Sequence, residues 1–136
     1  MITPPERKTY APGETIRATL RIRWRGEFDE IVVEFHKLYS LFGGAFGNRI
    51  VLQSRSQKRI AEGPQAYTQV ELEGIVPDWV NPGVYVCRFV HCSVPQRGWV
   101  TLFEDVHQVT LQVRRTAPPP PRGKEGAEFL GIEFRE

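Results

Sequence analysis

The sequence predicts an all-β fold, an antiparallel sandwich or barrel, and three observations lead to this prediction. Apolar and polar residues alternate without a break over residues 15–25, which is the period of a half-buried strand. Similar alternating segments recur along the chain, with turn sequences that contain glycine and proline between them. No segment shows a convincing helical spacing of apolar residues, so no helical crossovers between parallel strands are expected.

Residues 15–25 form the clearest predicted strand. Its inward face is expected to carry Ile16, Ala18, Leu20, Ile22 and Trp24. The opposite face carries threonine and arginine side chains, including Arg17, Arg21, Arg23 and Arg25. The same separation of even from odd positions underlies every other strand assignment, because successive side chains of a strand point to opposite faces.

Further strands are expected along the chain. They cover residues 31–35, with Ile31, Val33 and Phe35 inward, then residues 67–73, 84–93 and 100–114, the last with Val109, Leu111 and Val113 on its buried face. Residues 38–66 are ambiguous. Within them, residues 49–53 fit a short strand and residues 55–63 fit an edge strand or a loop.

The proline run divides the chain into three segments. Residues 1–115 are expected to form the β-sandwich, and residues 116–126 to form a stiff linker that contains four consecutive prolines. The last segment, residues 127–136, is apolar enough for a detached C-terminal strand or a docking tail. Its apolar residues are Phe129, Leu130, Ile132 and Phe134.

Length, charge and cysteine content narrow the function classes. The 136 residues fit one domain, and a net charge of +2 makes nucleic acid an unexpected partner. No apolar run is long enough to span a membrane, and the first residues do not resemble a signal peptide. Cys87 and Cys92 are expected to point to opposite faces of one strand and to stay unpaired. The chain is therefore expected to be cytosolic or a piece of a longer exported protein, and unpaired thiols favour the cytoplasm.

One short motif resembles the immunoglobulin-like class. In Pro82-Gly83-Val84-Tyr85-Val86-Cys87 a tyrosine stands two residues before a cysteine, as at the start of strand F in those domains. There the tyrosine closes the corner between two strands, and the resemblance implies a sandwich of about seven or eight strands. The partner cysteine of antibody domains is absent, because Leu20 or Ile22 stands at its place in strand B.

Two basic groups have a functional and a structural interpretation. The arginine row on residues 17–25 could bind a polyanion, but immunoglobulin-like topology places this strand beside the one that presents Glu71 and Glu73, so cross-strand ion pairs are favoured. A second group could suit single-stranded nucleic acid or a membrane surface, but a charged edge that prevents aggregation is favoured. It comprises Arg49, Arg55, Lys58 and Arg59, beside Phe42 and Phe46.

Catalytic and metal-binding signals are weak, so the chain is predicted not to be an enzyme. Cys87 opposite His107 could provide a nucleophile and a base or part of a metal site, but packing in the core is favoured. His36 and His91 have no carboxylate at motif spacing. No cofactor and no metal ion are predicted.

The strand at residues 84–93 is apolar on both faces, whereas a sandwich strand normally has one solvated face. Because contiguous exposed apolar surface usually marks an interface, the chain is predicted to be a non-catalytic binding or assembly module. The predicted contact residues are Val84, Val86, Arg88, Val90 and Cys92, with Phe129, Ile132 and Phe134 on a covering strand. The cover could come from the same chain, from a second subunit by strand exchange, or from another protein.

The alternative function is a carbohydrate- or ligand-binding module. The order of a Pro-Gly-Glu turn, a Gly-rich loop, the Pro-Gly-Val-Tyr corner and a closing strand is similar to the sugar-binding C-terminal domain of polysaccharide-exporting transporter ATPases. Such a module would use aromatic residues in loops. The candidates are Phe42, Phe46, Trp79 and Trp99.

Overall fold

The computed structural model describes residues 9–24, 26–38, 47–60, 66–114, 124–127, 130 and 132–134. They contain seven strands: β1 (Thr9–Tyr10), β2 (Thr15–Ile22), β3 (Glu30–Lys37), β4 (Arg49–Ile60), β5 (Tyr67–Ile75), β6 (Gly83–Val94) and β7 (Gly98–Val113). A single 3-10 turn at Lys124–Gly126 is the helical content of the described residues. The predicted all-β fold is therefore confirmed.

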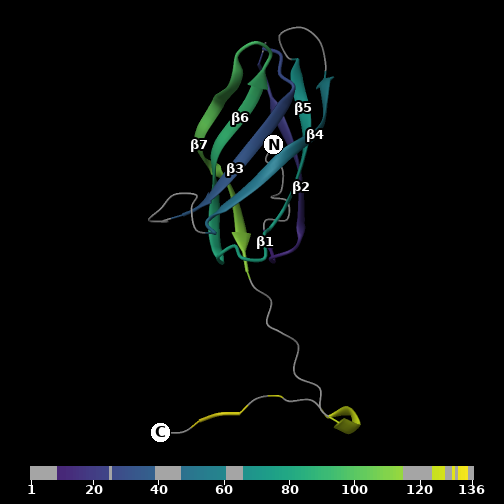
Figure 1. Cartoon of the computed structure of the whole chain (residues 1–136), viewed down its shortest axis with the longest axis vertical. Coiled ribbons are helices and arrows are strands. Elements are labelled where there is room, and N and C mark those ends of the chain that lie inside the picture. The colour runs from purple at the N-terminus through teal and green to yellow at the C-terminus, as the bar shows by residue number, and fades with distance from the viewer. Residues whose placement is uncertain are drawn as a thin grey trace, which may run out of the picture.

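The strands form one hydrogen-bonded sheet in the order β1-β7-β6-β3-β4-β5-β2 (Figure 1). Neighbouring strands are antiparallel, as predicted, except that β1 runs parallel to the end of β7. The first two strands of the chain therefore lie at opposite ends of the sheet. Among the described residues, no helix is long and apolar enough to cross a membrane.

Strand β4 links the two halves of the sheet. Its first residues pair with β3 and its later residues pair with β5, and Gln53 lies opposite a residue of each. A register shift between Ser54 and Ser56 follows this change of partner. The short strand expected at residues 49–53 and the described part of the ambiguous segment, up to Ile60, thus form one strand. Polar side chains exposed to solvent do not prevent backbone pairing with β5. Residues 61–63 of that segment lie outside the described residues.

Strand β2 is built as its sequence pattern predicts. Ile16 and Ile22 are buried, and the other apolar residues of this face, Ala18, Leu20 and Trp24, pack partly buried against the core. The residues between them are exposed. All seven strands contribute buried residues to the same hydrophobic core.

The predicted ion pairing between the arginine row of β2 and the acidic residues of β5 is confirmed for Arg17. Arg17 lies opposite Glu73, with 3.8 Å between Arg17 Nε and Glu73 Oε2. The hydroxyl of Thr19 donates a 2.9 Å hydrogen bond to Glu71. Arg25 lies outside the described residues.

The described part of the C-terminal segment belongs to no strand. Leu130, Ile132 and Phe134 are 86%, 70% and 87% exposed, and Phe129 lies outside the described residues. Their role as a covering strand stays a prediction, as do the boundaries of the three segments.

Candidate interaction surface

A β-bulge at Arg88 reverses the alternation of side chains along β6. Cys87 lies opposite Phe35 of β3 and Phe89 lies opposite Glu34, so Arg88 is an extra residue on β6. Before the bulge, odd-numbered residues point into the core, and after it Val90 and other even-numbered residues do so. The strand is therefore apolar at both odd and even positions because its inward face changes parity halfway along.

The bulge corrects the predicted set of contact residues on β6. Val90 and Cys92 are only 3% and 0% exposed and belong to the core, where strict alternation would have placed them outside. Val84 is 39% exposed, and Val86 and Arg88 are partly buried, so these three remain on the surface. The signal for the bulge in the sequence was the charged residue that interrupts the apolar run.

Both thiols lie in the core as a result. Cys87 and Cys92 are buried and unpaired, so the prediction that they point to opposite faces is wrong. Cys87 faces Val106 rather than His107, because β7 has extra residues between Val106 and Thr110. Burial raises the pKa of the Cys87 thiol to about 11.

The extra residues of β7 also correct its predicted buried face. His107 is exposed, and Val109, expected inward, is 44% exposed. Leu111 and Val113 are buried as predicted, because the regular register with β6 resumes at Thr110.

A polar and aromatic cluster that the sequence did not suggest lies on the outer face of β3 and β6. We call it the outer-face cluster, and it comprises Glu34, His36, Phe89 and His91. The Glu34 carboxylate lies 3.3 Å from Nε2 of His36 and 3.0 Å from Nε2 of His91. It accepts a hydrogen bond from each of these two ring nitrogens when that nitrogen carries a proton. The contact between His91 and Glu34 joins residues 57 positions apart, so no motif spacing could have revealed it.

The charge of Glu34 is balanced within the sheet. Arg49 Nη1 of β4 lies 3.5 Å from Glu34 Oε1. Partial burial by itself raises the pKa of the Glu34 carboxyl, but the hydrogen bonds from His36 and His91 and the charge of Arg49 outweigh it. The net pKa is held below its usual value of 4.5.

Phe89 is the centre of this face. Its ring stacks on His91 at 5.1 Å between centroids and meets the edge of His36 at 5.6 Å. The Arg88 guanidinium carbon lies 4.8 Å from the centre of the same ring, and Arg88 also forms an ion pair with Asp105 of β7. These contacts hold an aromatic side chain at the surface in a defined position.

Three of the four members of the second predicted basic group, Arg49, Arg55 and Arg59, contact polar side chains of the sheet. Arg49 contacts Glu34, and Arg55 Nη2 lies 3.8 Å from Glu73 Oε1. Arg59 donates to the Thr68 hydroxyl at 3.2 Å. Phe42 and Phe46 lie outside the described residues.

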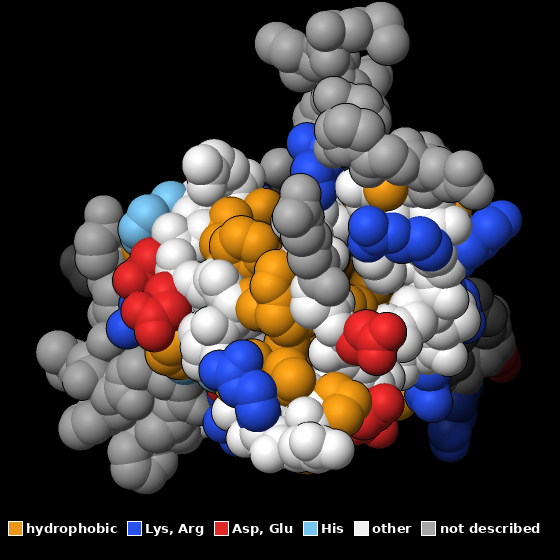
Figure 2. Space-filling view, turned by 90° about the horizontal axis from the view of Figure 1, so that it is seen from above, with side chains coloured by type: hydrophobic (Ala, Val, Ile, Leu, Met, Phe, Trp, Pro, Cys, Tyr) orange, Lys and Arg blue, Asp and Glu red, His pale blue; other side chains and the backbone are white. Residues whose placement is uncertain are grey.

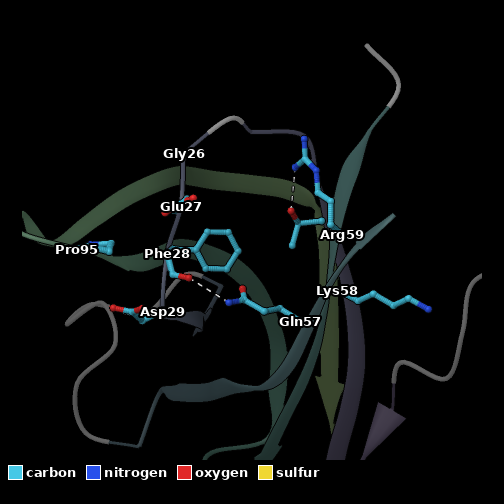
Figure 3. Close-up of a pocket in the computed structure, with 9 residues that line it drawn as sticks. Gly26, Glu27, Phe28, Asp29, Gln57, Lys58, Arg59 and Pro95 are labelled. Carbon is cyan, nitrogen blue, oxygen red and sulfur yellow. Dashed lines mark hydrogen bonds between the residues drawn. The ribbon is translucent and has the colours of Figure 1, made fainter. Parts of the chain in front are cut away.

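A separate pocket of about 480 Å³ lies at the end of the molecule that is uppermost in Figure 1. Residues 26–29, the later part of β4 and Pro95 line it (Figure 3). The Gln57 side chain crosses it and donates a 3.1 Å hydrogen bond to the Phe28 carbonyl. Figure 2 shows hydrophobic side chains gathered in the middle of this end, with basic and acidic side chains around them.

The two described aromatics of the predicted ligand site do not converge. Trp79 is 73% exposed in the connection that precedes β6, whereas Trp99 is 54% exposed and lies opposite Ser93, near the end of β6. At about 3.3 Å per residue, the length of β6 separates them by roughly 30 Å. Neither residue lines the pocket.

In the part of the chain that the structure describes, no group of three or more His, Cys, Asp or Glu side chains is arranged to hold a metal ion.

Comparison with known proteins identifies no relative of this chain. No family model, no curated protein and no solved structure matches the sequence or the fold.

Proposed function

We propose that the chain is a non-catalytic assembly module that contacts a protein, in the first instance a second copy of itself, through the outer face of β3 and β6. The observation that carries the proposal is the surface formed by Val84, Val86 and Phe89 beside the charges of the outer-face cluster. An apolar and aromatic centre with a polar rim is the usual anatomy of a protein interface.

The ion pairs already formed on this face support a protein partner. Glu34 and Arg88 already have partners within the sheet. A partner that covers Val86 and Phe89 therefore does not leave these charges unpaired, and unpaired buried charges are what makes burial costly. His36, the residue of β3 opposite Val86, also has a partner within the sheet, because its ring forms a hydrogen bond with Glu34.

We infer that the single sheet folds over as an immunoglobulin-like sandwich. Two features of the topology support this: β4 changes partner midway, and the chain passes from β1 beside β7 to β2 beside β5. A third is the hydroxyl of Tyr85, which donates a 2.6 Å hydrogen bond to the carbonyl of Asn81, four residues upstream. This is the corner hydrogen bond of the class.

The proposal that the chain is non-catalytic is supported by the state of its two thiols. A cysteine nucleophile reacts as the thiolate, which needs access to substrate and a low pKa. Cys87 is buried, its pKa is raised, and its neighbour across the ladder is Val106. These features favour a packing role.

The test of the assembly proposal is the mass of the chain in solution after Val86→Asp. An aspartate at this position places a charge at the centre of the proposed contact, so self-association should be lost while the domain stays folded. Gln108→Asp, which adds the same charge at an exposed position of β7, is the matched control and should leave the mass unchanged. An unchanged mass for Val86→Asp would remove the proposal.

The pocket favours a second candidate function, the binding of a small ligand such as an oligosaccharide. Its volume of about 480 Å³ lies within the usual range for ligand sites. Trp24 stacks on Phe28, a lining residue, with 6.1 Å between the ring centroids, so Trp24 fluorescence should report an occupant. In a chain with Trp79→Phe and Trp99→Phe, titration with oligosaccharides should quench this fluorescence. No response would count against this candidate.

A further inference from the structure

Strand β2 has an edge to which another strand can add. It is the last strand of the sheet and pairs with β5 on one side, and no strand of the described residues pairs with its other side. All eight of its residues, Thr15–Ile22, pair with β5 without a register shift. A regular strand of this length presents a row of backbone groups that can template a further strand.

The outer edge of β7 is a poorer acceptor. β1 covers only its residues Gln112 and Val113. Two register shifts with β6 interrupt the rest of the strand, and Asp105 has a positive φ of 53°. Such irregularities bend a strand away from pairing, which is how native edges are protected.

The C-terminal segment has the pattern of a strand without a sheet. Leu130, Ile132 and Phe134 recur at every second position and are exposed in the single chain. Glu133 stands between two of them and is also exposed. This period would place the three apolar side chains on one face of a strand and Glu133 on the other.

The charges of the two segments are complementary. Residues 124–136 contain four glutamates against one lysine and one arginine, a net charge of −2 (2 minus 4). The solvent side of β2 carries Arg17, whose side chain is 77% exposed, and Arg21. On its other side, Ala18 and Leu20 are only partly buried, so apolar side chains added at this edge would extend the core.

We propose that residues 130–134 of one chain add as a strand to the free edge of β2 in a second copy. The apolar row then faces the rim of the core, and Glu133 lies on the side of the arginines. This inference rests on the assembly role proposed above and assigns it a second contact, distinct from the outer face.

The exposure of the apolar row favours a second copy over the chain's own β2. The linker residues before the 3-10 turn, 115–123, can span at most about 30 Å, at roughly 3.3 Å per residue. The sequence places four consecutive prolines in this linker, and proline runs in general favour an extended polyproline conformation of roughly 3.1 Å per residue. In the single chain the three apolar side chains remain exposed, so its own sheet does not bury them. Reciprocal exchange of the segments would close a two-fold dimer.

The test combines sedimentation with hydrogen exchange of β2 amides in the full-length chain. Wild type should dimerise with rising concentration, and exchange over residues 16–21 should slow by at least about tenfold in the dimer. Ile132→Asp, which places a charge in the apolar row, should stay monomeric with fast exchange in β2. Ala127→Asp carries the same charge outside the row and should behave as wild type.

Each other outcome has a distinct meaning. Protection of β2 that does not depend on concentration but is lost in Ile132→Asp means that the segment docks on its own chain, and it overturns the inference. A dimer that survives Ile132→Asp but not Val86→Asp overturns it as well, while the proposed outer-face contact stands. The reverse pattern supports the exchange and removes the outer-face contact. A monomer at every concentration removes both.

Discussion

Tyr85 connects the sequence motif to the packing of the sheet. Its side chain is fully buried, and its hydroxyl donates to the carbonyls of Asn81 at 2.6 Å and Gly47 at 3.2 Å. These bonds tie the start of β6 to the connection before it and to the residues that precede β4. Burial raises the pKa of the Tyr85 hydroxyl to about 12, so it remains a donor throughout the neutral range.

Tyr85→Phe should destabilise the domain by about 1–2 kcal/mol, because both hydrogen bonds of the buried hydroxyl are lost. Urea denaturation measures the change, with Tyr67→Phe as the control at a partly buried tyrosine. The raised pKa also predicts that the stabilisation is complete below pH 10 and is lost as the pH rises from 10 to about 12. An effect of Tyr85→Phe no larger than that of Tyr67→Phe would contradict this role.

The two thiols should be unreactive in the folded protein. Burial raises the pKa of Cys87 to about 11 and also raises that of Cys92, so little thiolate forms at neutral pH. A thiol reagent should therefore label both residues only when the protein unfolds. Two variants, Cys87→Ser and Cys92→Ser, each leave one thiol and so assign each labelling rate to one residue. Fast, selective labelling of folded Cys87 would instead indicate an accessible nucleophile and revive an enzymatic function.

The outer-face cluster, which joins β3 to β6, predicts that the stability of the fold depends on pH. The pKa of Glu34 is lowered in the fold, so its ionised form stabilises the protein above pH 4.5, and this contribution is lost as the pH falls through the folded pKa. Glu34→Gln should be less stable than wild type at neutral pH, and the difference should vanish in acid. Thermal melting of both proteins over this range measures it. A difference independent of pH would show that the charge has no such role.

The bulge of β6 predicts which single-residue deletion the sheet tolerates. Deleting a residue from a strand normally turns every later side chain to the other face. Deleting Arg88 should instead leave Val90 and Cys92 inward and restore strict alternation, since residue 88 is the extra one opposite β3. The deletion of Arg88 should therefore keep a cooperative unfolding transition, whereas deletion of His91 should abolish it. Equal loss in both would contradict the assignment of the bulge.

These elements also show what the sequence could reveal. The faces of β2 follow from its pattern because eight successive residues pair with β5 without interruption. The faces of β6 and β7 do not, since bulges at Arg88 and after Val106 change the parity while the apolar residues still recur. The outer-face cluster could not be predicted either, because Glu34 meets His91 only through the register of β3 with β6.

In the whole molecule, different parts of the sheet have different surroundings. The buried residues of all seven strands form the core and determine the fold. Within the residues that the structure describes, the proposed contacts are assigned to the outer face of β3 and β6, the unpaired edge of β2 and the exposed apolar residues of the C-terminal segment. Surfaces of this kind are typical of proteins that function in assemblies.

The decisive measurement for the proposed assembly is sedimentation of the wild-type 136-residue chain over a range of concentrations. We expect the mass to rise with concentration from the 15.6 kDa of one chain towards twice that value. A mass of 15.6 kDa at every concentration would contradict it.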